Sequence, residues 1–215
     1  MQPCVACAKE CVLAFMTRLR AMNDADFLKA SIVYHAAPTL MGLKPSTLIC
    51  PSGGERDLER ALADCIPDLE GRFDVKTALF RNHAGKVLLL VFQEALLRSC
   101  LADTGAASLL TEEGYDGKSG LDGMLETLRG KVATPRFPHE IGVFLGYPAA
   151  DVRSFMADGG KKASSTGCWK AYGDERSARR VSDTYQRVKL RAAELLMRGG
   201  DPVAVVGELR RGVAA

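Results

Sequence analysis

The alternation of apolar and polar residues predicts a chain rich in helices, with one pronounced β-hairpin. Apolar side chains recur every three or four positions in residues 5–22, 55–65 and 93–132, which is the period of amphipathic helices. Asp174 is placed to cap a further long helix, which carries apolar residues as far as Leu196. Helices therefore supply most of the predicted structure.

The hairpin consists of residues 73–81 and 86–92, joined by the turn 82–85. Residues 87–92 are apolar throughout, so we expect this strand to lie centrally with both faces covered. Residues 168–172 predict another short strand. We predict an α+β fold, in which a small antiparallel sheet (hairpin 73–92 plus a strand near 168–172) is flanked by helices.

The length favours a single globular domain over residues 1–215, with an N-terminal helix in 1–22 and a C-terminal helix in 199–215 as peripheral extensions. Hydrophobic residues make up 47% of the chain and charged residues 26%, as in ordinary globular proteins. The net charge of +3 is too small to favour nucleic acid or an anionic membrane as a partner.

The cysteine count and the first residues bear on location. Charged side chains such as Lys9 and Arg18 interrupt the N-terminal apolar residues, unlike in a secretory signal, and the apolar run 87–92 is too short to span a bilayer. Seven cysteines, an odd number without a paired pattern, favour reduced thiols. We therefore expect a cytoplasmic protein.

The densest segment is residues 137–152, which predicts a helix, a sharp elbow and a second helix. Gly142 and Gly146 lie four apart and leave a flat strip on the first helix, which Pro148 brings to an end. The second helix should end at Gly159. This frame would hold His139, Tyr147 and Asp151 close together, either as a site or as a packed corner of the core.

A second segment, residues 35–44, contains Pro38 and Gly42, which we expect to break a helix. His35 and Lys44 would then flank an irregular turn, the kind of place where binding groups concentrate. The alternative for His35 is a structural role at the negative end of the helix dipole.

Cys4, Cys7 and Cys11 could share one face of the first helix. Thiolates at this spacing can bind zinc or an iron–sulfur cluster, although no fourth ligand is evident. The alternative is that they pack as small hydrophobic side chains.

Three motifs carry a family resemblance: HAAPTLMGLK at 35–44, PHEIGVFLGYPAADV at 138–152 and GCWKAYGD at 167–174. In this order they resemble a bacterial family, common in anaerobes, that is known only as a domain of unknown function. The resemblance spans residues 27–190 and implies no reaction. Members often have a cysteine after the first histidine, where this chain has Ala36, so a Cys–His nucleophile pair cannot be carried over.

Three functional hypotheses follow from the sequence. The first is a small-molecule or cofactor pocket, with possible enzymatic activity, in which His35 and His139 line one shared cavity as acid–base groups and Asp151 orients a histidine. The second is a noncatalytic interaction protein that docks a partner on the Gly142–Gly146 strip. The third is a metal or redox accessory protein that uses the N-terminal cysteines. The candidate ligand-binding residues of the first hypothesis are Lys44, Glu140, Tyr147 and Lys170; no cofactor or reaction is specified.

Overall fold

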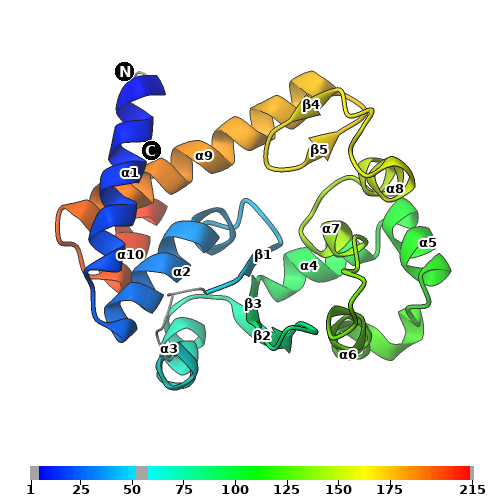
Figure 1. The fold of residues 1–215 in the computed structure, drawn as a ribbon, viewed down its shortest axis with the longest axis horizontal. Helices are drawn as coiled ribbons and strands as arrows, with labels where there is room; N and C mark the ends of the chain where they lie inside the picture. The colour runs from blue at the N-terminus through cyan, green and yellow to red at the C-terminus, as the bar shows by residue number, and fades with distance from the viewer. Residues whose placement is uncertain (1–4, 52–57, 214–215) are drawn as a thin grey trace.

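The computed structural model describes residues 5–51 and 58–213 (Figure 1). Helices dominate, and the strands are short. In chain order the elements are α1 (Val5–Arg20), α2 (Asp24–Leu40), β1 (Ser46–Ile49), α3 (Leu58–Arg72), β2 (Lys76–Arg81), β3 (Val87–Phe92), α4 (Glu94–Leu101), α5 (Thr104–Glu112), the 3-10 turn η1 (Gly117–Ser119), α6 (Gly120–Val132), α7 (Ile141–Phe144), α8 (Ala149–Asp158), β4 (Ser165–Thr166), β5 (Lys170–Ala171), α9 (Glu175–Met197) and α10 (Pro202–Val213).

The predicted α+β class is confirmed, with one correction to the sheet. The main sheet is antiparallel in the order β1-β3-β2, and β2 and β3 form the predicted hairpin. Its third strand is β1, whereas the strand predicted near 168–172 is the short β5, which pairs with β4 in a separate two-stranded sheet. Local alternation identified a strand there, but the pairing partner depends on where the chain folds back, and this is not a local property.

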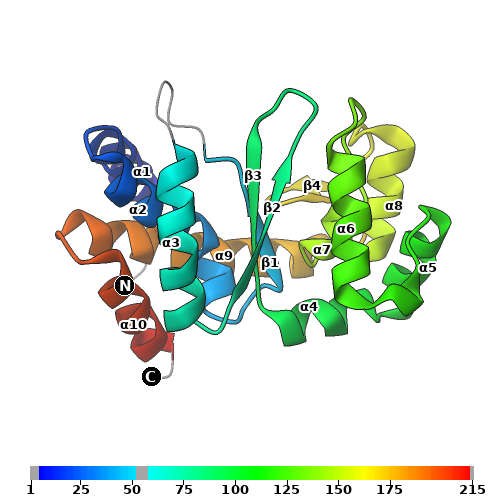
Figure 2. The ribbon, with the colours of Figure 1, turned by 90° about the horizontal axis from the view of Figure 1, so that it is seen from below.

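Strand β3 separates two hydrophobic cores, as its uniformly apolar sequence predicted. Leu89 and Val91 face one core, while Leu88, Leu90 and Phe92 face the other. Figure 2 shows the sheet standing between two groups of helices. The alternation of side chains along a strand therefore divides one apolar segment between two cores.

The first core, core one, lies among α1, α2, α3, α9 and α10, and the second, core two, lies among α4–α8. Both terminal helices belong to core one, since Phe15 of α1 and Val206 of α10 are fully buried. Helices α1 and α10 thus each bury side chains in core one.

Helix α2 corrects a second expectation. It continues through Pro38 to Leu40, so His35 lies inside the helix and not at the edge of a turn. The chain leaves the helix at Gly42, which has φ of 72°, and the Leu43 amide donates to the Pro38 carbonyl at 2.9 Å. Packing on both sides of α2, which is buried over most of its length, outweighs the local cost of an internal proline.

In the described part of the chain, no helix combines the length and the apolar character needed to cross a bilayer.

Candidate functional site

The elbow predicted from the sequence joins α7 to α8. Helix α7 is a single turn that Gly146 ends with φ of 78°, and the Tyr147 amide donates back to the Gly142 carbonyl at 2.9 Å. Pro148 precedes the first residue of α8, and Gly159 ends α8 in the left-handed conformation. Local turn chemistry therefore directs the chain as predicted.

The strip formed by Gly142 and Gly146 is covered by the chain itself. A Cβ atom on Gly142 would lie 2.8 Å from Val152 Cγ2, and one on Gly146 would lie 2.6 Å from the Pro45 ring. These glycines allow α7 to approach α8 and the 41–45 loop closely. The strip is thus an internal packing surface, which corrects its interpretation as a docking surface.

Beside the elbow lies a mainly apolar pocket of about 220 Å³, which we call the elbow pocket. Its floor is formed by apolar side chains of α7 and α8, and four of the predicted site residues line it. The lining residues are His139, Ile141, Gly142, Leu145, Tyr147, Asp151, Val152, Phe155, Trp169 and Lys170.

An aromatic wall closes one side of the elbow pocket. The rings of Tyr147 and Trp169 stack with centroids 5.2 Å apart and an interplanar angle of 20°. The Tyr147 hydroxyl donates to the Cys168 carbonyl at 3.1 Å, which fixes the ring in place. Burial raises the pKa of Tyr147 well above its usual value, so its hydroxyl stays protonated. The wall is therefore rigid and uncharged.

Asp151, in the first turn of α8, holds the β4–β5 segment against that helix. Its carboxylate accepts from Trp169 Nε1 at 2.8 Å and from the backbone amides of Tyr172 and Gly173 at 2.9 and 3.2 Å. The group is only 6% exposed. Asp151 thus orients Trp169, and not a histidine as expected from the sequence.

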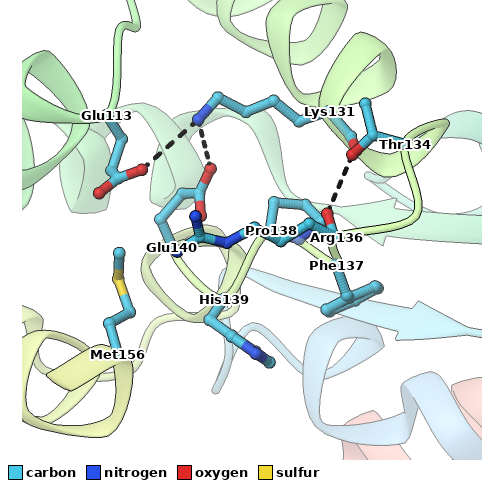
Figure 3. Close-up of a pocket in the computed structure, with 9 residues that line it drawn as sticks. All are labelled: Glu113, Lys131, Thr134, Arg136, Phe137, Pro138, His139, Glu140 and Met156. Atoms are coloured by element: carbon cyan, nitrogen blue, oxygen red, sulfur yellow. Dashed lines mark hydrogen bonds and ion pairs between the residues drawn. The ribbon is translucent and has the colours of Figure 1, made fainter.

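A second, more polar pocket of about 170 Å³ adjoins the elbow pocket (Figure 3). There Glu140 is 3% exposed and pairs with Lys131 Nζ at 2.8 Å, while the Tyr115 hydroxyl donates to it at 3.3 Å. Lys131 also lies 3.6 Å from Glu113. Glu140 is therefore satisfied by the protein itself, as a buried carboxylate requires.

The two candidate histidines contact different residues. His139 is exposed, packs edge-on against Phe137 and Phe155, and in Figure 3 points away from the Lys131–Glu140 pair. His35 packs against Tyr34 in α2, and burial together with the positive charge of Lys189 lowers the pKa of His35 to about 4. His139 lines both pockets, and His35 lines neither of them.

The two candidate lysines lie in different surroundings. Lys170 lines the elbow pocket, where its Nζ donates to Thr166 Oγ1 at 2.9 Å. Lys44 is 8% exposed and lies behind the aromatic wall, with its Nζ 5.3 Å from the centroid of the Tyr147 ring. Tyr147 therefore lines the elbow pocket and also contacts the buried ammonium of Lys44.

Residues 32–206 match the model of a family described as "Protein of unknown function (DUF3793)". The chain belongs to the DUF3793 family. The match spans α2 to α10 and includes every element that contributes to the elbow pocket, and it confirms the resemblance noted in the sequence. No curated protein and no solved structure matches the chain.

The cysteines of this DUF3793 chain leave the metal hypothesis untested. Cys4 and the side chain of Cys7 lie outside the described residues, and Cys11 is half-buried in α1. Within residues 5–51 and 58–213, no group of three His, Cys, Asp or Glu side chains is arranged to hold a metal ion.

Two residues near the site were missed by sequence reasoning. Trp169 was assigned only to a strand, although it forms the aromatic wall; its being the only tryptophan, inside a family motif, was an available signal. Lys189 lies on α9, with its Nζ 4.9 Å from the centroid of the Tyr34 ring, and no motif in this DUF3793 sequence marks it. Both contacts arise from segments distant in the chain.

Proposed function

We propose that this protein binds a small molecule with a flat, apolar body in the elbow pocket. The observation that carries the proposal is the rigid wall of stacked Tyr147 and Trp169 facing an apolar floor. Flat, apolar groups pack favourably on such a surface. The volume of about 220 Å³ is below the range of drug-sized sites, so the ligand is of metabolite size.

The polar groups at the pocket define the rest of the ligand. Lys170 contributes a positive charge, whereas the Asp151 carboxylate is already bonded to three N–H donors. We therefore propose that the ligand also carries an anionic group, which Lys170 binds. His139 lines the same pocket and is the side chain that would exchange a proton with the ligand if the protein catalyses a reaction.

Trp169 makes the proposal testable, because it is the only tryptophan and lies in the pocket wall. Aryl carboxylates such as naphthoate, which combine a flat apolar body with an anion, should quench its fluorescence in a saturable manner. Lys170→Met should raise the dissociation constant about tenfold, as expected for losing one charge-assisted contact. Lys162→Met, which changes an exposed lysine, is the matched control.

Native mass spectrometry of the purified protein tests for a ligand that co-purifies. The proposal is wrong if a panel of aryl carboxylates leaves Trp169 emission unchanged and no ligand co-purifies. It is also wrong if His139→Ala and Lys170→Met both leave the titrations unaltered.

We also propose a cytoplasmic location. Cys50, Cys65, Cys100 and Cys168 are thiols and not disulfides, as is usual for proteins of reducing compartments. A thiol count on protein purified without reductant tests this, and a disulfide involving these residues would contradict it.

A further inference from the structure

Lys44 is a buried cation held by a well-ordered loop. Its side chain is 8% exposed, and both neighbouring carbonyls are fixed: the Leu43 carbonyl accepts from the Tyr185 hydroxyl at 3.2 Å, and the Pro45 carbonyl accepts from the Gln93 amide at 2.9 Å. Pro45 also packs directly against Gly146 of the elbow. The position of the Lys44 side chain is therefore set by three separate elements of the fold.

Within the described part of the chain, no carboxylate pairs with this cation, and the acidic group that acts on it is the Cys168 thiol. Among the described residues, Lys44 Nζ has no ion pair and no hydrogen bond; its neighbours are the rings of Tyr147 and Tyr185, with centroids at 5.3 and 5.9 Å. Lys131 provides a contrast within the same protein, since its half-buried side chain pairs with Glu140 and Glu113. Aromatic faces compensate only part of the cost of removing an ammonium from water.

A second cation lies nearby. Lys189 lies one turn after Tyr185 on α9, on the side where Lys44 meets the Tyr185 ring. Its Nζ is 4.9 Å from the centroid of the Tyr34 ring, and within the described residues it too has no ion pair. Burial, opposed by the Cys168 thiol and assisted by the positive charge of Lys189, lowers the pKa of Lys44 to about 8. Lys44 remains mostly protonated at neutral pH, so two ammonium groups repel one another here.

The Lys44 ammonium can be reached from solvent. Every fully buried side-chain nitrogen and oxygen among the described residues has a hydrogen-bond partner. Because Lys44 Nζ has none, its tip must touch the molecular surface even though the stem is buried. A ligand could therefore contact the ammonium without unfolding the loop.

Two partly desolvated cations without a carboxylate are complementary to an anion. We propose that Lys44 and Lys189 together form a binding site for a small oxyanion, a carboxylate or a phosphate. The site lies behind the Tyr147 ring from the elbow pocket and does not depend on the function proposed for that pocket. An anion here would pair with both ammonium groups, for which the described residues provide no carboxylate.

The test is thermal unfolding of the full-length protein in sodium phosphate, sodium malonate or sodium chloride at equal ionic strength. At about ten times its dissociation constant, the bound oxyanion should raise Tm by about 3 °C relative to chloride. Phosphate and malonate distinguish a phosphate ligand from a carboxylate ligand. The response should disappear in Lys44→Met and in Lys189→Met, and persist in Lys86→Met, a matched change of an exposed lysine in the hairpin.

The Lys44→Met variant should also differ from the wild type in its Tm when no oxyanion is present. Because it removes an unpaired buried charge, it should have a higher Tm than the wild type in chloride while losing the oxyanion response. Equal stabilisation of the wild type by all three salts would overturn the proposal, as would an oxyanion response that survives in Lys44→Met. If Lys189→Met fails to fold, Lys189→Gln keeps the size and polarity of the side chain without the charge.

Discussion

His35 shows how burial alone changes the chemistry of a residue. The sequence placed it in a turn as an acid–base group, but it lies within α2 beside Lys189, and its pKa falls from 6.5 to about 4. Such a histidine is neutral near pH 7 and accepts a proton only in acid. Its surroundings therefore favour a structural contribution, the alternative considered from the sequence, although not through the helix dipole.

The lowered pKa of His35 gives a pH dependence with a definite sign. Between pH 6.5 and about 4 the unfolded chain binds a proton that the folded chain excludes, so stability falls as the pH falls through this range. The free energy of unfolding should fall by on the order of 2 kcal/mol more for the wild type than for His35→Gln. Urea unfolding at several pH values measures the difference.

The control for this experiment is His83→Gln, which changes an exposed histidine of the hairpin turn. Equal pH dependence of the wild type and His35→Gln would show that His35 is not desolvated in the folded state. The comparison between variants is needed because carboxylates titrate over part of the same range.

At the level of elements, the elbow depends on close approach of backbones. Gly146 combines φ of 78° with a Cβ position 2.6 Å from Pro45, and Gly85 in the hairpin turn has nearly the same φ, 75°, but open space around it. Comparing alanine substitutions at these two glycines therefore separates the cost of backbone strain from the cost of steric overlap.

Gly85→Ala should lower the free energy of unfolding by about 1 kcal/mol, since alanine resists a positive φ. Gly146→Ala should cost about 1–3 kcal/mol beyond that, because the added methyl group must displace Pro45. Chemical denaturation of both variants gives the two values. Equal losses would mean that the 41–45 loop yields to the methyl group and that the contact does not constrain the elbow.

The elements were predicted from the sequence where local chemistry decides the structure. The apolar run of β3, the Asn82 turn and the Gly159 helix end were all identified correctly. Pro38 was misinterpreted because tertiary burial of α2 outweighs the local helix-breaking tendency of proline. The second partner of β3, which is β1, was missed because this pairing depends on contacts distant in the sequence.

The candidate site, too, was predicted from the sequence only where local chemistry decides the structure. His139, Tyr147, Asp151 and Lys170 converge on one pocket because the elbow that positions most of them is encoded locally. Lys44 has no carboxylate partner among the described residues and lies next to α9. Its surroundings depend on a long helix crossing the molecule, which no local pattern reveals. Individual residue types thus indicated chemistry, and the fold decided which of them meet.

At the scale of the whole molecule, β3 couples the two cores. Leu89 and Leu90 are adjacent and fully buried, yet they belong to core one and core two respectively. Damage to either core is therefore transmitted to the sheet that the other core also uses.

Leu89→Ala and Leu90→Ala should each lower the free energy of unfolding by about 2–5 kcal/mol within a single transition. Trp169 fluorescence, which reports from beside core two, should follow the same curve as far-UV circular dichroism even for Leu89→Ala. Leu79→Ala is the matched control, because Leu79 is 41% exposed on β2. Separate transitions, or a Trp169 curve unaffected by Leu89→Ala, would show that the cores unfold independently.

The two cores also differ in the order in which their residues are synthesised. Core two is assembled from the continuous stretch 78–152, whereas core one needs residues 15–91 together with residues 192–209. Residues 192–209 are the last part of core one to be synthesised, so α1, α2 and α3 emerge long before the helices that cover them. In refolding of the full-length protein, the shorter sequence separations within core two should also protect Leu109 and Leu128 before Ala192 and Val206, which pulsed hydrogen exchange measures. Until residues 192–209 have emerged, the nascent chain would thus present the apolar surface of α1, α2 and α3 to chaperones.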